Sequence, residues 1–87
     1  MKYYYAKLEG RDGVIKHEGA SHNEFYTGYF LDGDKLTYTW VRTTYPEKDW
    51  LDAYGKCTVV TQKFLNELEP IDKHFDNLDE VKDFLDS

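Results

Sequence analysis

The sequence predicts an α+β domain in which a small antiparallel sheet, of about four or five strands, is packed by a C-terminal helix. Residues 25–45 alternate between apolar and polar side chains on both sides of an Asp-Gly-Asp turn, which is typical of a β-hairpin. Residues 77–86 instead carry apolar side chains at helical spacing. With 87 residues, of which 17% are aromatic, the chain is expected to form a single domain over residues 1–87.

A first hairpin is predicted over residues 2–18. Its first half is rich in tyrosine, which favours a strand. The segment Gly10–Gly13 reads GRDG, and the Asp12-Gly13 pair within it is the strongest turn signal in this part of the chain. The return strand follows this turn, and the polar residues 19–24 are expected to form a loop.

The second hairpin spans residues 25–45. Its second strand, Lys35 to Tyr45, places Leu36, Tyr38 and Trp40 on one face and threonine and valine side chains on the other. This strand is expected to end at Pro46, because proline has no amide hydrogen to donate to a neighbouring strand.

Two later segments are less clear. Residues 46–54 favour a short helical turn that ends at Gly55, although a loop fits them nearly as well. Residues 57–69 contain a Thr-Val-Val-Thr run that favours a strand, and Phe64, Leu65 and Leu68 at the spacing of a helical turn. We interpret this segment as a strand through about residue 66.

The clearest helix covers residues 77–86. Asn77 is followed three residues later by Glu80, the spacing of a capping box. At about 100° per residue, the apolar side chains fall in one arc of about 120°, which is expected to pack on the sheet. These side chains are Leu78, Val81, Phe84 and Leu85.

Charge is distributed unevenly along the chain. The formal net charge is −6, yet residues 1–46 contain equal numbers of acids and bases. Residues 66–87 contain eight acids and two bases, so the whole imbalance lies in the last quarter. A negative field repels nucleic acid and anionic membranes and attracts basic surfaces. We therefore expect a partner protein with a basic surface, and neither direct nucleic-acid binding nor membrane binding.

The polar face of the predicted helix is acidic. Its first turn contains three carboxylates, which the positive end of the helix dipole favours. Asp83 and Asp86 lie towards the other end, where the dipole disfavours them, so they have no evident role in stability. The face is either an ordinary solvated surface or a contact surface for a partner. Its carboxylates are Asp76, Asp79, Glu80, Asp83 and Asp86.

Aromatic side chains are a second candidate contact surface. A sheet with one helix is covered on only one face, so the other face would expose aromatic rings, unless each ring is partly buried beside its neighbours. Tyr4 lies next but one to Ala6, and Tyr26 next but one to Gly28, so these two tyrosines look least like core residues. The candidate partner-binding residues are Asp72, Asp76, Asp79, Glu80, Asp83, Asp86, Tyr4 and Tyr26.

No motif indicates an enzyme, a cofactor or a metal. His17 and His22 flank a loop with two glutamates, but their spacing matches no established metal site. Cys57 precedes the Thr-Val run and is expected to be a small buried side chain rather than a nucleophile. Neither a phosphate-binding glycine loop nor a nucleophile elbow is present.

The sequence also predicts a location. The polar start of the chain does not resemble a signal peptide, and no apolar run approaches the ~20 residues that a membrane span needs. The single cysteine excludes an internal disulfide. These features are typical of the cytoplasm.

In size and charge the chain is similar to small acidic proteins made by phages, some of which inhibit nucleic-acid enzymes by presenting carboxylates where phosphates would bind. This similarity implies a non-enzymatic inhibitor, of the DNA-mimic or anti-CRISPR kind, that occupies a basic surface of its partner. The alternative is an accessory domain that self-associates through an open sheet edge or an exposed aromatic face. A small metalloprotein or enzyme that uses the histidines is a third hypothesis.

Overall fold

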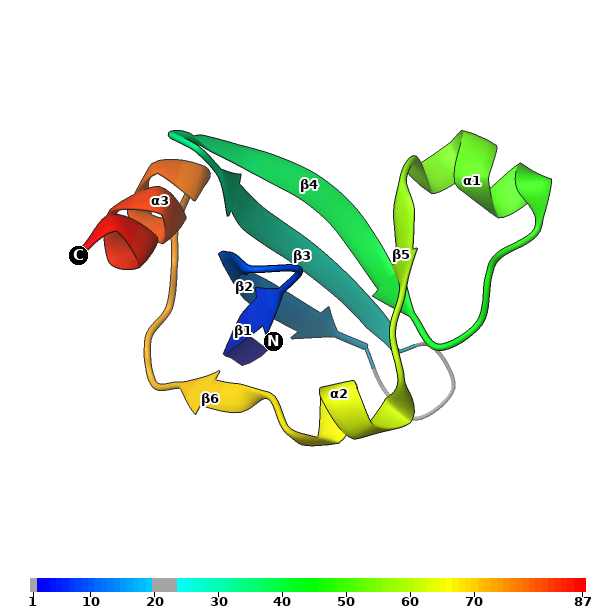
Figure 1. Ribbon diagram of the computed structural model, residues 1–87, viewed down its shortest axis with the longest axis horizontal. Coiled ribbons are helices and arrows are strands. Elements are labelled where there is room, and N and C mark those ends of the chain that lie inside the picture. The colour runs from blue at the N-terminus through cyan, green and yellow to red at the C-terminus, as the bar shows by residue number, and fades with distance from the viewer. Residues whose placement is uncertain (1, 20–23) are drawn as a thin grey trace.

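The computed structural model describes residues 2–19 and 24–87, and within them it confirms an α+β fold with a C-terminal helix (Figure 1). Six strands form one mixed sheet in the order β5-β4-β3-β2-β1-β6. The elements are β1 (Lys2–Leu8), β2 (Arg11–Glu18), β3 (Phe25–Asp32), β4 (Lys35–Arg42), α1 (Lys48–Tyr54), β5 (Cys57–Val59), α2 (Gln62–Asn66), β6 (Glu69–Ile71) and α3 (Leu78–Asp86).

The four long strands β1 to β4 form an antiparallel meander, so the hairpins predicted over residues 2–18 and 25–45 are confirmed. Two strands of three residues each complete the sheet at its edges. β6 pairs antiparallel with β1, whereas β5 pairs parallel with β4. The parallel pair arises because the chain leaves the end of β4, passes through α1 and returns to run beside β4 in the same direction.

The turn of the first hairpin lies three residues before the predicted Asp12-Gly13 pair. Leu8 pairs with Arg11, so Glu9 and Gly10 form the two-residue turn, with φ of 53° and 78°. Positive φ at both central positions is the requirement of a type I′ turn, which suits the right-handed twist of a hairpin. Gly13 instead lies inside β2.

Gly13 is needed in β2 because of Phe30. Gly13 and Phe30 face each other across the β2–β3 ladder, and the Phe30 ring lies over the backbone of Gly13. A methyl group at Gly13 would overlap the ring, and one at Gly28 would lie 2.6 Å from its Cε2 atom. The two glycines therefore make room for a large side chain that is 4% exposed.

Helices cover both faces of the sheet, in contrast to the expected single covered face. On one face, α2 and the residues around it pack against a buried cluster, with Phe64 and Leu65 contributed by α2. We call this the α2 face. Its buried residues are Ala6, Ile15, Phe30, Val41 and Val60.

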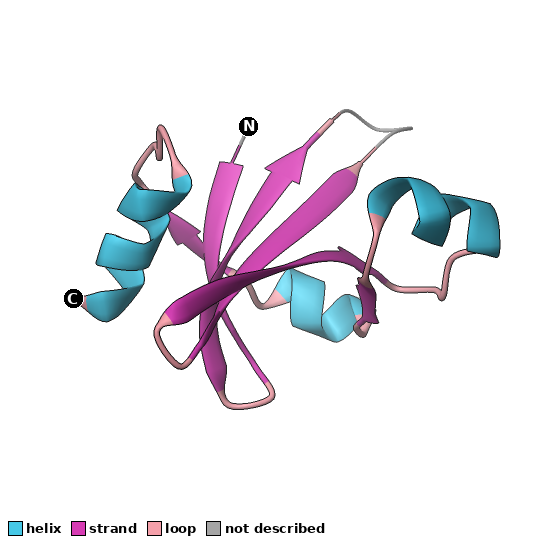
Figure 2. Cartoon of the chain, turned by 90° about the horizontal axis from the view of Figure 1, so that it is seen from above, coloured by secondary structure: helices cyan, strands magenta, loops and turns pink. Residues whose placement is uncertain are grey.

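On the opposite face, which α3 covers, Val14, Phe75 and Val81 are buried. Phe84 and Leu85 of α3 pack around them. The α1 helix lies at the other end of the molecule from α3, as two perpendicular views show (Figures 1 and 2).

Two predicted boundaries, at the end of β4 and after β5, differ from those of the structure. β4 ends at Arg42 rather than Tyr45, so Pro46 lies beyond the strand. The strand predicted through residue 66 was wrong beyond Val59, because Thr61 caps α2 by accepting a hydrogen bond from the amide of Phe64. The short helix predicted within residues 46–54 is confirmed as α1, with Gly55 at its C-terminal cap.

The helix predicted over residues 77–86 is confirmed as α3, with Asn77 as its N-cap. The Glu80 amide donates to Asn77 Oδ1 at 3.0 Å, and the Glu80 carboxylate accepts from the Asp76 amide at 3.3 Å. Leu78 is the exception in the apolar arc, because it is 49% exposed whereas Val81 is buried.

We predict that Gly13→Ala destabilises the protein by about 1–3 kcal/mol, because the added methyl group displaces the Phe30 ring. Strand propensity alone favours alanine over glycine, so the packing effect and the propensity effect have opposite signs. Urea unfolding measures the difference. The control is a double-mutant cycle with Phe30→Leu, in which the cost of Gly13→Ala should fall markedly. A stabilised single variant would contradict the packing explanation.

Candidate functional site

The solvent-exposed acidic face of the helix α3, called the α3 face from here on, contains carboxylates with two kinds of surroundings. Three of them have local partners. Asp76 lies 3.3 Å from His74 Nε2, Glu80 caps the helix, and Asp86 accepts a hydrogen bond from Lys82 at 3.0 Å. Asp76 precedes the N-cap and therefore lies outside the first turn, where the sequence placed it.

Asp79 and Asp83 make no ion pair within the described residues. Both are exposed. The turn between β3 and β4 adds Asp34 to their neighbourhood. The pKa of Lys82 is raised, first by its hydrogen bond with Asp86 and further by the charges of Asp34 and Asp83. Carboxylates from two elements therefore surround one lysine.

The remaining predicted contact residues lie elsewhere on the molecule. Tyr4 and Asp72 line an open pocket of about 600 Å³ beside β6. Tyr26 stacks on His17, with ring centroids 4.3 Å apart, and packs against the buried cluster of the α2 face. The structure therefore brings Tyr4 and Asp72 together. It places Tyr26 in the pocket next to α1, at the other end from α3.

That second pocket has a volume of about 680 Å³ and lies between α1 and the adjoining ends of β3 and β4. Both tryptophans of the chain line it. Trp40 is almost fully buried at 2% exposed, whereas Trp50 is 49% exposed. We call it the aromatic pocket. Its lining residues are Glu24, Phe25, Tyr26, Trp40, Val41, Arg42, Tyr45, Pro46, Glu47, Trp50 and Tyr54.

Hydrogen bonds to the C-terminal end of α1 hold the aromatic pocket in shape. Trp40 Nε1 donates to the Gly55 carbonyl at 2.8 Å, and the Tyr38 hydroxyl donates to the Tyr54 carbonyl at 3.2 Å. The Trp40 ring stacks on Phe25 with centroids 5.5 Å apart. The helix itself has no buried residue, so its position depends on these contacts at one end.

Sequence reasoning noted the aromatic residues of this pocket but missed its charged ones. Glu24 and Glu47 line it, and so does Arg42, whose guanidinium lies 5.6 Å from the centroid of the Trp40 ring. They come from three separate segments, so no spacing in the sequence joins them. The one available signal was the alternation of β4, which places Arg42 on the face of Trp40.

In the described part of the chain, the side chains considered for a metal site are not brought together. His17 Nε2 is buried, has no hydrogen-bond partner there and lies 3.8 Å from Glu24. His22, the second histidine of the suggested metal site, lies outside the described residues. Among the residues described, no group of three or more metal-ligating side chains is placed to hold an ion.

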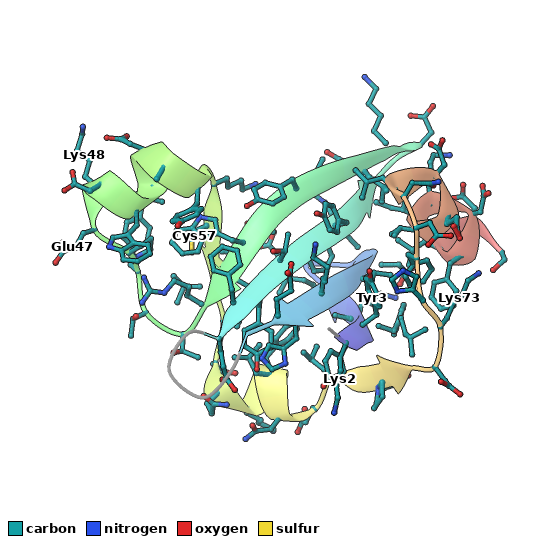
Figure 3. All side chains as sticks on the ribbon, turned by 180° about the vertical axis from the view of Figure 1, so that it is seen from behind. Lys2, Tyr3, Glu47, Lys48, Cys57 and Lys73 are labelled. Atoms are coloured by element: carbon teal, nitrogen blue, oxygen red, sulfur yellow. The ribbon has the colours of Figure 1, made fainter. Side chains whose placement is uncertain are left out.

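Cys57 is half-buried in the edge strand β5 (Figure 3). Burial raises the pKa of its thiol, and the nearby Arg42 charge opposes this shift only in part. A raised pKa lowers the thiolate fraction and with it the nucleophilicity of the group.

Compared with protein-family models, curated proteins and solved structures, the chain gives no match. None of the helices in the described ranges combines the length and the apolar character that crossing a bilayer requires.

We predict that Cys57 reacts with Ellman's reagent more slowly in the folded protein than in the urea-unfolded chain at the same pH, because burial disfavours its thiolate. The pH at which the rate is half-maximal should also lie higher in the folded protein. Absorbance at alkaline pH measures both quantities, and Cys57→Ser provides the blank. Faster reaction of the folded protein would show an activated thiol.

Proposed function

We propose that the protein is a small non-enzymatic binding protein whose acidic α3 face occupies a basic, nucleic-acid-binding surface of a partner. The observation that carries this proposal is the pair of exposed carboxylates, Asp79 and Asp83, which have no ion pair within the described residues. A carboxylate that is already hydrated and unpaired loses no internal partner when it meets an arginine or a lysine.

The scale of the face is consistent with DNA mimicry. Asp79 and Asp86 are separated along the helix axis by roughly 10 Å, at about 1.5 Å per residue. This distance equals the axial rise of about three phosphates of one DNA strand, at about 3.4 Å each. The proposal in its most specific form is therefore an inhibitor of the anti-CRISPR or DNA-mimic kind, encoded by a phage and acting in the cytoplasm of its host.

Self-association is the second candidate function. Val59 in the edge strand β5 is exposed, and so are Tyr45 and Trp50 near it in the fold. An edge strand with an exposed β-branched residue can pair with a second copy. We expect light scattering to give the mass of a monomer, 10.3 kDa, if the α3 face is the working surface. A dimer that persists at high salt would favour self-association instead.

We predict that Asp83→Lys with Asp86→Lys abolishes partner binding while leaving the free energy of unfolding unchanged or raised. The substitution removes the exposed Lys82–Asp86 pair, but lysines near the C-terminal end of a helix interact favourably with its dipole and offset that loss, so the variant should stay folded. The measurement is capture of partners from the native host by the immobilised protein, with elution in a salt gradient, alongside urea unfolding.

The matched control is Glu67→Lys with Glu69→Lys, which changes the net charge equally but at the C-cap of α2 and in β6. The control should retain the partner and release it at only slightly lower salt. Equal losses in both variants would mean that net charge matters rather than the α3 face. No loss in either would exclude this face as the contact surface.

A further inference from the structure

The aromatic pocket presents apolar surface that the fold itself does not use. Trp50 and Tyr54 stack on each other with centroids 5.7 Å apart, yet both remain about half exposed, at 49% and 46%. Tyr45, on the segment before α1, is 71% exposed. No residue of α1 is fully buried, although the Tyr54 ring contacts the buried Trp40 ring at 5.6 Å between centroids. The exposed parts of Trp50, Tyr54 and Tyr45 therefore remain available to a ligand.

We propose that the aromatic pocket binds a cationic side chain, an arginine or a lysine, of the protein partner. This inference rests on the proposed function in one respect only, namely that the partner surface is basic. It adds a second contact site, separate from the α3 face, and assigns it a ligand chemistry.

The charges of the pocket favour a cation. Two carboxylates, Glu24 and Glu47, line it against one guanidinium, that of Arg42. Glu47 makes no ion pair in the described part of the chain, and Asp49 is exposed in the first turn of α1. Lys48, between them, pairs with Asp52 at 3.1 Å and so leaves these two carboxylates unpaired within the described residues. Figure 3 shows Glu47 at the α1 end of the molecule, far from Tyr3 and Lys73 at the α3 end. A cation entering this end therefore meets a net negative charge.

The aromatic walls supply the second part of the recognition. A guanidinium over a Trp ring within about 6 Å of its centroid is attracted by the ring quadrupole. Arg42 already lies over Trp40 in this way, at 5.6 Å, without a carboxylate within 4.0 Å in the described residues. Trp50 and Tyr54 offer comparable surfaces that carry no such cation in the described structure. The volume of about 680 Å³ is within the range of small-ligand sites and admits a long basic side chain.

Arg42 also raises the opposite hypothesis, that the pocket binds a carboxylate. Two observations oppose it. An anion would enter a pocket that Glu24 and Glu47 line, and the chain as a whole has a formal net charge of −6. The two hypotheses predict opposite effects on ligand affinity when one of these charges is removed. Variants that neutralise a single side chain therefore decide between them.

The test uses a blocked Gly-Arg-Gly peptide as the probe, with Gly-citrulline-Gly as its neutral isostere and Gly-Glu-Gly as its acidic counterpart. Since both tryptophans line the pocket, intrinsic fluorescence reports binding directly. We expect the arginine peptide to change the emission saturably in the millimolar range and the other two peptides to have no effect. Glu47→Gln should weaken binding about two- to fivefold, and Arg42→Gln should strengthen it.

Nuclear magnetic resonance separates this proposal from the function of α3. In a titration, the Trp50 indole signal should shift with the arginine peptide, and it should do so equally in the Asp83→Lys, Asp86→Lys variant. If only α3 amides shift, the pocket proposal fails while the acidic-face function stands. A preference for the acidic peptide, or a gain from Glu47→Gln, would overturn the assignment of a cationic ligand.

Discussion

The central constraint on this structure is that the four-stranded meander is apolar on both faces. Val14 and Ile15, adjacent in β2, are both fully buried and point to opposite faces. An antiparallel sheet that is buried on both faces needs two covering layers, and the residues after β4 must supply both. This requirement explains why α2 packs on one face and α3 on the other, with β6 between them in sequence.

The same constraint leaves α1 without a place in the core. It sits at the crossover that turns the chain from β4 into the parallel strand β5, where its role is to connect two strands that run in one direction. Its position is fixed by Trp40 and Tyr38, whose polar atoms bond to the backbone at its C-terminal end. The aromatic pocket is thus a by-product of topology whose inner wall, Trp40, is nevertheless buried and hydrogen-bonded.

The sequence predicted correctly those elements that are determined by neighbouring residues in the chain. The hairpins followed from alternation, α3 from its capping residues, and the end of α1 from Gly55. The first turn could not be located in this way, because Asp12-Gly13 is the strongest local turn signal and yet Glu9 and Gly10 form the turn. Gly13 lies beneath the Phe30 ring inside the sheet, a contact between β2 and β3 that local turn chemistry does not reveal. The segment after Val59 likewise became helical because Phe64 and Leu65 cover the α2 face, which outweighs the strand propensity of the residues before them.

The candidate surfaces show the same division between local and long-range information. The sequence indicated five carboxylates on the polar face of the predicted helix and the capping spacing of Glu80. It did not indicate that Asp76 lies before the helix and pairs with His74, because that contact depends on backbone geometry. The aromatic pocket was invisible as a site, because Glu24, Arg42 and Glu47 are brought together only by the fold.

The separation of the two surfaces limits how a partner can use them. They lie at opposite ends of a molecule whose longest extent is 36 Å. A standard-size interface covers about 800 Å² on each partner. The accessible surface of this protein is 6017 Å², so such an interface would cover about an eighth of it. A partner that engages both ends must therefore be concave or extended. In that arrangement the contributions of the two ends to the binding free energy should add, because no residue is shared between them.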